Sequence, residues 1–431
     1  MRKINIYAIA RSAAALVIVM TAISCSSSWL DVEDDTDRKV LLLYSAGFNN
    51  LAGYLKDDIK DLKSGWLPGG RKEDDIVLVY SHFTTSGYNT PSSPTLVRLY
   101  SGRDSEVVAD TLIVYPSETI SSSAGQVNKV LAYIKDNIKA RSYGMIFSSH
   151  ATGYLPAGYY QNEDNVLSEG ITWGARMYNG ATAVPYVEPE YDPSLPMVKS
   201  IGQDQVGVSG SYLSYEIDLA DFAEAIPMYL DYILFDACLM GGVEVAYELS
   251  GKVGKLGFSQ AEVLAEGLCY TTLTGHLLKN EDPDPRSVCE DYFNQYDVKT
   301  GAWRSATISL IDCSNMEPVA RVCRDLFTKY ADNLKEIDAS KVQRFYRHGR
   351  HWFYDLESIL INAGINQLEL DSLHEALDRC VMYKAHTPEF MEEFEIDTFC
   401  GFSMYLPCMG STALDSYYKE LKWNKTTGLV N

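Results

Sequence analysis

Basic residues are scarce in this chain of 431 residues, in which 37 Lys and Arg stand against 58 Asp and Glu. The formal net charge is −21. A nucleic-acid-binding domain needs a basic footprint, so this balance argues against nucleic acid as a partner. It is compatible with cationic substrates, although net charge mainly governs solubility and electrostatic steering.

Several signature motifs of common enzyme classes are also absent. The sequence contains no GxSxG elbow, P-loop, GxGxxG turn, HExxH helix or EF-hand loop. Serine hydrolase, nucleotide-binding and zinc-peptidase functions are therefore unsupported. One HxxH pair, His348 and His351, lacks an evident third ligand and lies among arginines, so we interpret it as structural or surface.

The nine cysteines show no CxxC spacing and are too sparse for a disulfide scaffold. The sequence therefore predicts no metal site. Most of the cysteines are expected to be small buried hydrophobic residues, and the pattern leaves one or two bridges open.

No apolar run is long enough for a comfortable membrane span. The longest candidate, Ala13–Ile23, follows basic residues near the N-terminus and predicts a targeting segment. It leads into Ala22-Ile23-Ser24-Cys25, which resembles a bacterial lipoprotein cleavage box. This resemblance implies a signal peptide over 1–24 and lipid on the Cys25 sulfur. An ordinary signal peptide cut nearby, or an uncleaved anchor, is the alternative.

Residues 25–37 would then form a short acidic tether. A Ser-rich and acidic stretch after the lipidated cysteine partly resembles the surface-export signals of some bacterial lipoproteins. We therefore expect a protein of the cell envelope, anchored to a membrane by its N-terminal lipid, and the export-signal resemblance implies display at the surface.

The rest of the chain reads as an α/β fold. Hydrophobic residues make up 46% of the sequence, enough for a large buried core. Apolar runs typical of buried strands alternate with helical patterns, which predicts a mostly parallel sheet covered by helices on both faces. These strand-like runs cover residues 40–45, 75–80, 145–148, 232–235 and 256–259.

We divide the chain after the tether into a main domain over 38–303 and a helix-rich C-terminal α/β subdomain over 304–431, which we expect to return one strand to the main sheet. Within the main domain, residues 157–211 are rich in Gly, Pro, Tyr and Asn. A long irregular insert in a compact domain is usually functional or mobile.

Two of the predicted strands end on reactive side chains. Residues 143–149 lead to His150, and residues 231–236 lead through Ala237 to Cys238. Chemistry in open α/β sheets gathers outside the carboxyl ends of the strands. An imidazole beside a thiol can generate the nucleophilic thiolate, so the pattern predicts a Cys/His dyad. A buried cysteine and a histidine that only caps its strand are the structural alternatives.

The flanking residues carry a family resemblance. Asp236-Ala237-Cys238-Leu239-Met240 followed by Glu244, with an upstream histidine after a strand, resembles the clostripain-like cysteine peptidases, relatives of caspases, legumains and gingipains. Further landmarks in the expected order lie at 40–51, 258–260, 354–356 and 401–407. The resemblance covers nearly the whole mature chain. It implies a caspase-like sheet sandwiched by helices in the main domain.

The resemblance also implies a mechanism. Cys238 would attack a peptide carbonyl to form a thioester, with His150 as general base and acid, and water would hydrolyse the intermediate. The backbone N–H groups of Ala151 and Cys238 would bind the oxyanion. The family usually has Gly where this chain has Ala151, and a further family glycine stands at Gly153. If the position required a positive φ, Ala151 would be strained by about 1 kcal/mol.

The resemblance also implies a specificity, through acidic residues near the cysteine. An acid two residues before the cysteine is associated in the family with Arg or Lys at P1, and Asp236 stands there. The alternative role of Asp236 is capping of neighbouring amides. Glu262 and Glu266 lie in a segment that resembles a second pocket-lining loop. Relatives can cut themselves after a basic residue in the insert, where Arg176 and Lys199 are the only two.

The expected substrates are therefore proteins or peptides. No cofactor is expected, although the resemblance leaves calcium possible. The alternative function is a catalytically weak or inactive envelope lipoprotein that serves as a binding module, motivated by Ala151 and the altered segment 262–267.

Overall fold

The computed structural model describes residues 37–85, 90–160, 180–185, 194–199, 204–208, 211–347, 349 and 351–431. The predicted signal peptide, nearly all of the tether, Cys25 and Arg176 lie outside these ranges. Among the described residues, no helix combines the length and the apolar character that a membrane crossing requires.

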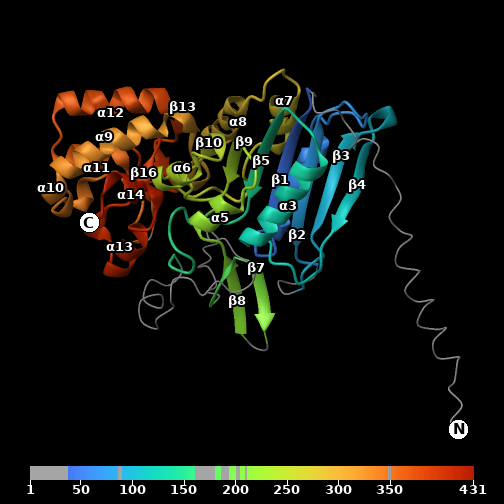
Figure 1. The fold of residues 1–431 in the computed structure, drawn as a ribbon, viewed down its shortest axis with the longest axis horizontal. Helices are drawn as coiled ribbons and strands as arrows, with labels where there is room; N and C mark the ends of the chain where they lie inside the picture. The colour runs from blue at the N-terminus through green and yellow to red at the C-terminus, as the bar shows by residue number, and fades with distance from the viewer. Residues whose placement is uncertain are drawn as a thin grey trace, which may run out of the picture.

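A nine-stranded sheet forms the centre of the molecule, in the order β13-β11-β10-β9-β5-β1-β2-β3-β4 (Figure 1). The five strands from β10 to β2 run parallel, and two antiparallel strands extend the sheet at each edge. In chain order the strands are β1 (Lys39–Gly47), β2 (Ile76–Phe83), β3 (Thr95–Ser101), β4 (Val107–Val114), β5 (Ser142–Ser148), β9 (Leu230–Asp236), β10 (Val253–Phe258), β11 (Thr307–Asp312) and β13 (Val381–His386).

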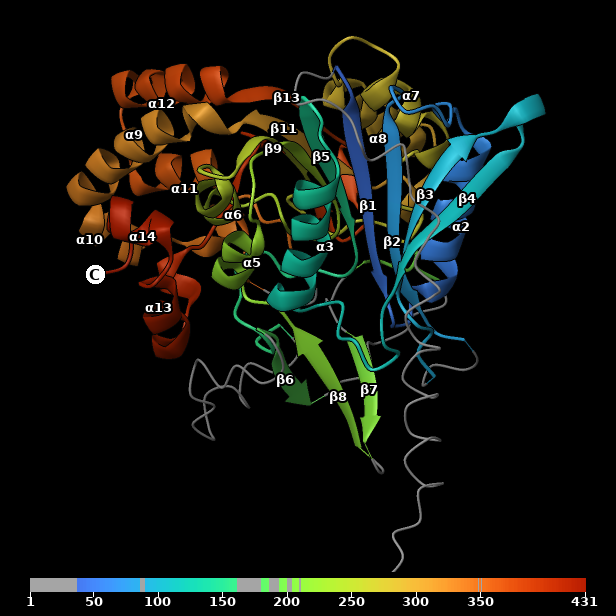
Figure 2. The same ribbon diagram turned by 45° about the vertical axis from the view of Figure 1, so that its right-hand side comes forward.

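The central strands are apolar along their whole length because both faces of the sheet are covered. Every residue of β1 is buried, and β5 and β9 are buried except at their second residue. Helices α3 (Ala124–Asn137), α5 (Leu219–Ala225) and α6 (Val243–Leu249) lie on one face, and α2 (Ala52–Ser64), α7 (Tyr270–Leu278) and α8 (Pro285–Asp297) lie on the other (Figure 2). The predicted parallel sheet between two helical layers is confirmed.

The C-terminal part of the chain is built into the same sheet. We expected it to return one strand, and it contributes two, β11 and β13. Its helices lie together at one end of the molecule (Figure 1). They are α9 (Met316–Lys329), α10 (Ala331–Lys335), α11 (Leu356–Ala363), α12 (Gln367–Cys380), α13 (Thr412–Tyr418) and α14 (Lys422–Thr427). Two short strand pairs accompany them, β12 (Tyr354–Asp355) with β16 (Ser403–Met404) and β14 (Glu389–Phe390) with β15 (Phe394–Glu395).

The insert between β5 and β9 contains a separate small sheet. Its strands β6 (Thr182–Pro185), β8 (Ser211–Glu216) and β7 (Asp204–Val208) pair in that order, antiparallel. Figure 2 shows β7 and β8 beyond the carboxyl ends of β1 and β5. This small sheet therefore lies beyond the edge of the main sheet where the candidate site was expected.

Candidate active site

The register of β5 and β9 brings the two predicted site segments together. Ser148 pairs with Asp236 across these neighbouring parallel strands, and Phe147 pairs with Phe235. His150 and Cys238 each follow two residues later. Both residues therefore follow the carboxyl ends of neighbouring parallel strands.

Cys238 is fully buried. Its sulfur accepts a hydrogen bond from the Val263 N–H at 3.0 Å and lies 3.6 Å from the Val263 carbonyl oxygen. The next residue, Leu239, has a φ of 62°, a left-handed conformation that is uncommon for leucine. Its N–H donates to the Ala261 carbonyl at 2.9 Å, which helps to hold this turn. Such strain clusters at functional sites, and a leucine gave no signal of it in the sequence.

His150 is buried, and its Nε2 lies 2.7 Å from Asn50 Oδ1. An amide oxygen only accepts, so Nε2 carries the proton and Nδ1 is left as the acceptor. Burial is the main reason that the pKa of His150 falls to about 3. The positive charge of Lys199 also lowers this pKa, and a hydrogen bond to the Lys199 backbone opposes the shift only in part. The imidazole is therefore neutral. Sequence reasoning placed Asn50 in a family landmark but gave it no role.

The backbone at Ala151 is unstrained. Ala151 is not among the residues with positive φ, whereas Gly153 has a φ of 63°. A Cβ on Gly153 would lie 2.5 Å from the Leu239 carbonyl oxygen. The glycine requirement in this loop therefore falls on Gly153, and the strain considered for Ala151 does not arise.

Residues 197–199 of the insert lie along the segment that contacts the cysteine. Val198 forms an antiparallel bridge with Leu264. The Lys199 N–H donates to the Val263 carbonyl at 2.8 Å, and the Ala265 N–H donates to the Met197 carbonyl at 2.8 Å. An extended chain is thus added to the backbone of 263–265, in the way that peptides add to an exposed strand edge.

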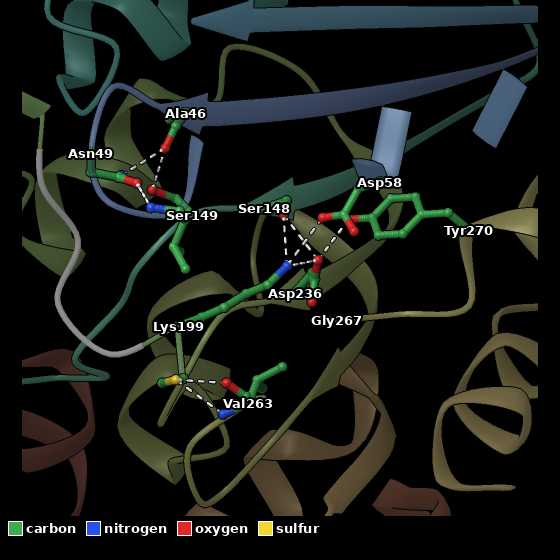
Figure 3. A network of polar contacts seen from close by, with 12 residues as sticks. Ala46, Asn49, Asp58, Ser148, Ser149, Lys199, Asp236, Val263, Gly267 and Tyr270 are labelled. Atoms are coloured by element: carbon green, nitrogen blue, oxygen red, sulfur yellow. Dashed lines mark hydrogen bonds and ion pairs between the residues drawn. The ribbon is translucent and has the colours of Figure 1, made fainter. Parts of the chain in front are cut away.

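The Lys199 side chain ends in a buried polar cluster, which we call the Lys199 cluster (Figure 3). Its ammonium forms an ion pair with Asp236 and lies 3.3 Å from both Asp58 Oδ2 and Ser148 Oγ. Asp236 Oδ2 also accepts hydrogen bonds from Ser148 Oγ at 2.9 Å and from the Tyr270 hydroxyl at 2.6 Å. The cluster therefore gathers residues of α2, β5, β9 and α7 around one lysine.

The charges in the cluster favour a protonated lysine. Burial lowers the pKa of Lys199, but Asp236 and Asp58 together outweigh it and leave the pKa above its ordinary value. Burial raises the pKa of Asp58, an effect that the attraction of Lys199 only partly offsets. Sequence reasoning missed Asp58 as a site residue. Its signal was its position three residues after Leu55 and four before Leu62, an acid within the apolar stripe of a helix.

The two glutamates expected near the pocket have partners elsewhere. Glu262 forms an ion pair with Arg347, whose second nitrogen lies 3.1 Å from Glu262 Oε1. Glu266 forms an ion pair with Lys299 near the surface. The second acid of the Lys199 cluster is instead Asp58, from α2.

The other candidate residues are the remaining cysteines and the histidine pair. The eight cysteines from Cys238 onward are all free thiols. Within the described ranges, no group of three or more His, Cys, Asp or Glu is arranged to hold a metal ion. His351 contacts the Gly349 carbonyl, and its predicted partner His348 lies outside the described residues.

Comparisons with known proteins identify the family and the fold. Residues 189–424, more than half of the chain, match the family model of the clostripain family. No curated protein matches the sequence. Among solved structures, an inactive zymogen of a C11 protease from Parabacteroides distasonis aligns with a TM-score of 0.71 at 22% identity, over 92% of this chain and 99% of that one.

A secreted C11 cysteine protease from Bacteroides thetaiotaomicron, in complex with an irreversible peptide inhibitor, aligns with a TM-score of 0.68 at 22% identity, over 91% of this chain and 99% of that one. These structures share the fold, and the family model covers the segment that contains Cys238. The chain therefore belongs to the clostripain family of cysteine peptidases.

Proposed function

We propose that this protein is an endopeptidase that cleaves after basic residues, with Cys238 as nucleophile and His150 as base, and that it first cuts its own chain after Lys199. One observation carries the proposal: the Lys199 ammonium is paired with Asp236, two residues from Cys238, while its backbone lies along 263–265. Lys199 thus occupies the place that a P1 side chain requires.

The proposed chemistry uses the atoms already described. His150 Nδ1 takes the thiol proton, and the Cys238 sulfur attacks the carbonyl carbon of the P1 residue. The N–H groups of Ala151 and Cys238 bind the oxyanion. The imidazolium then protonates the leaving amine as the C–N bond breaks, which leaves a thioester. Water, deprotonated by His150, hydrolyses the thioester and restores the thiol.

The position of residues 197–199 supports self-processing at the bond between Lys199 and Ser200. Of the two basic residues in the insert, Arg176 lies outside the described residues, and Lys199 has its side chain in the cluster and its backbone paired beside Cys238. The zymogen from Parabacteroides distasonis shows that this fold occurs in an inactive precursor form. An uncut Lys199 would exclude an external substrate, so cleavage would open the site.

The test compares the chain from Ser26 with its Cys238→Ala variant. We expect the first to yield two fragments, the second beginning at Ser200, and the variant to stay intact. The processed protein should hydrolyse fluorogenic peptides with Lys or Arg at P1 and spare those with Ala or Asp. Parallel assays with added calcium and with chelator would test the calcium expectation. An intact chain that hydrolyses none of these peptides, also after cutting with trypsin, would overturn the proposal.

We also propose that the protein is exported and anchored through lipid on Cys25, as its sequence suggests. The expected result is incorporation of labelled palmitate into the full chain and its loss in Cys25→Ala. A chain released into the medium without lipid would contradict the anchoring.

A further inference from the structure

We propose that Asp58 is a second specificity-determining carboxylate of the P1 pocket and that it makes the enzyme select Lys over Arg. The inference rests on the proposed function, in which Lys199 marks the P1 position. It adds a residue from a helix far from both strand ends in the sequence, since Asp58 and Lys199 are 141 positions apart.

Asp58 lies on the buried face of α2, beside Leu55 and Leu62. Its side chain is only 8% exposed, and its Oδ2 lies 3.3 Å from the Lys199 ammonium. A carboxylate in an apolar helical stripe costs free energy unless it is paired. The contact with a lysine supplies that pairing, which gives the residue a role that packing alone does not explain.

The arrangement of acceptors fits an ammonium group. Lys199 Nζ has three contacts to oxygen, from Asp236, Asp58 and Ser148, which come from three different elements (Figure 3). A lysine ammonium carries three N–H donors on one compact centre. An arginine guanidinium is a planar fork with five donors and prefers a carboxylate in bidentate geometry. Asp236 Oδ2 already accepts from Ser148 and Tyr270 as well as from Lys199, and of the two oxygens only Oδ1 has no hydrogen-bond partner among the described residues. A bidentate fork would therefore have to compete with these donors at Oδ2.

The backbone at Gly267 closes the cluster. Gly267 has a φ of 64°, and a Cβ built there would lie 2.5 Å from both Asp236 carboxylate oxygens and 2.6 Å from the Lys199 ammonium nitrogen. The Tyr296 hydroxyl and the Gln295 side-chain amide donate to the Gly267 carbonyl at 3.0 and 3.2 Å, which holds this loop in place. The outer nitrogens of a guanidinium would extend beyond the ammonium position into this backbone.

The charge balance gives Asp58 its expected effect on turnover. Two buried carboxylates face one cation, and the pKa of Asp58 is raised because burial penalises its charged form. A P1 ammonium relieves the repulsion between the carboxylates, whereas an uncharged P1 side chain leaves it in place. Replacing the carboxylate with an amide keeps the shape and removes the charge.

The experiment measures kcat/KM for matched peptides with Lys or Arg at P1 on the processed full-length enzyme, for wild type, Asp58→Asn and Asp57→Asn. Asp57 is the exposed neighbour on the same helix, so Asp57→Asn makes the same change of charge outside the cluster. We expect wild type to prefer Lys by roughly tenfold or more, since one hydrogen bond to a charged group is worth about that much. Asp58→Asn should lose most of this preference because its kcat/KM for the Lys peptide falls. Asp57→Asn should keep the preference.

A wild-type enzyme whose kcat/KM for Arg at P1 equals or exceeds that for Lys would overturn the inference, whatever the variants do. So would an Asp58→Asn enzyme with an unchanged Lys to Arg ratio. If Asp58→Asn fails to fold, Ser148→Ala tests the same three-acceptor arrangement, and an unchanged ratio there counts against it. A wild type without any peptidase activity is a different result, because it removes the proposed function itself.

Discussion

Asn50 Oδ1 lies 2.7 Å from His150 Nε2, so the amide of one loop fixes the tautomer of the imidazole on the next strand end. Asn50 follows β1, and β1 pairs with β5, the strand that delivers His150. In many active sites with a nucleophile and a base, a third group orients the base, and Asn50 is placed to do so here. Asn50 thereby becomes a positioning residue for the proposed base.

We expect Asn50→Ala to lower kcat by roughly tenfold, the worth of one hydrogen bond that orients a charged intermediate, with little change in KM. Asn50→Asp keeps the acceptor and should retain more activity, with the acid limb of its pH profile moved upward, because a carboxylate raises the pKa of the imidazole. A purely structural role would instead give equal losses in both variants and an unmoved profile.

The second prediction concerns the reactivity of Cys238 before and after processing. In the uncut chain Cys238 is buried and burial depresses the pKa of His150 to about 3, so the thiol lacks an effective activating partner. Ser200→Pro retains Lys199 and should resist cleavage. We expect Cys238 in this variant to react with iodoacetamide roughly tenfold or more slowly than in the processed enzyme.

The measurement is mass spectrometry of the peptide that contains Cys238, with the half-exposed Cys269 as internal reference. Equal labelling of Cys238 in both forms would show that the site is open without processing.

The third prediction concerns stability. Removing Lys199 leaves Asp58 and Asp236 buried without a cation, and breaking a buried ion pair in this way typically costs about 3 kcal/mol. In a Cys238→Ala background, which cannot cut itself, Lys199→Met should lower the free energy of unfolding by about 3 kcal/mol. The loss should be smaller at pH 5 than at pH 8, because protonation of a carboxyl group relieves the repulsion. Urea unfolding of both proteins at both pH values would measure this loss. An unchanged free energy of unfolding would show that the pairing contributes nothing.

The fourth prediction follows from Glu244, which is buried against the Tyr405 N–H and the Tyr418 hydroxyl. Burial raises its pKa to about 7, and these hydrogen bonds only partly oppose the shift. A carboxyl with a raised pKa binds its proton more tightly in the folded state. Its contribution to stability is therefore full below about pH 4 and is lost as the pH rises to about 7.

Glu244→Gln cannot titrate, so the wild type should lose about 3 kcal/mol more than this variant between pH 4.5 and pH 7.5. Subtracting one curve of unfolding free energy against pH from the other removes the contributions of Asp58 and Asp355, whose pKa values are also raised. Parallel curves for the two proteins would exclude the titration of Glu244.

Much of the fold was predictable from local pattern. The apolar runs that became β1, β5 and β9 are continuous because these strands are covered on both faces, and such runs are visible in a single sequence. The return of β11 and β13 to the sheet was only partly foreseen, since antiparallel pairing of distant strands depends on contacts that local pattern does not encode.

The sequence by itself determined the strand ends that His150 and Cys238 follow, and the resemblance to the family. It did so because buried strands appear as continuous apolar runs, and residues that directly follow parallel strands lie at the same edge of the sheet. Only the tertiary structure decided that Lys199 reaches Asp236, that Asp58 joins them from α2, and that Glu262 faces Arg347. The physical reason is that an ion pair depends on where long loops return in space, and acids of equal charge are indistinguishable along the chain until burial selects among them.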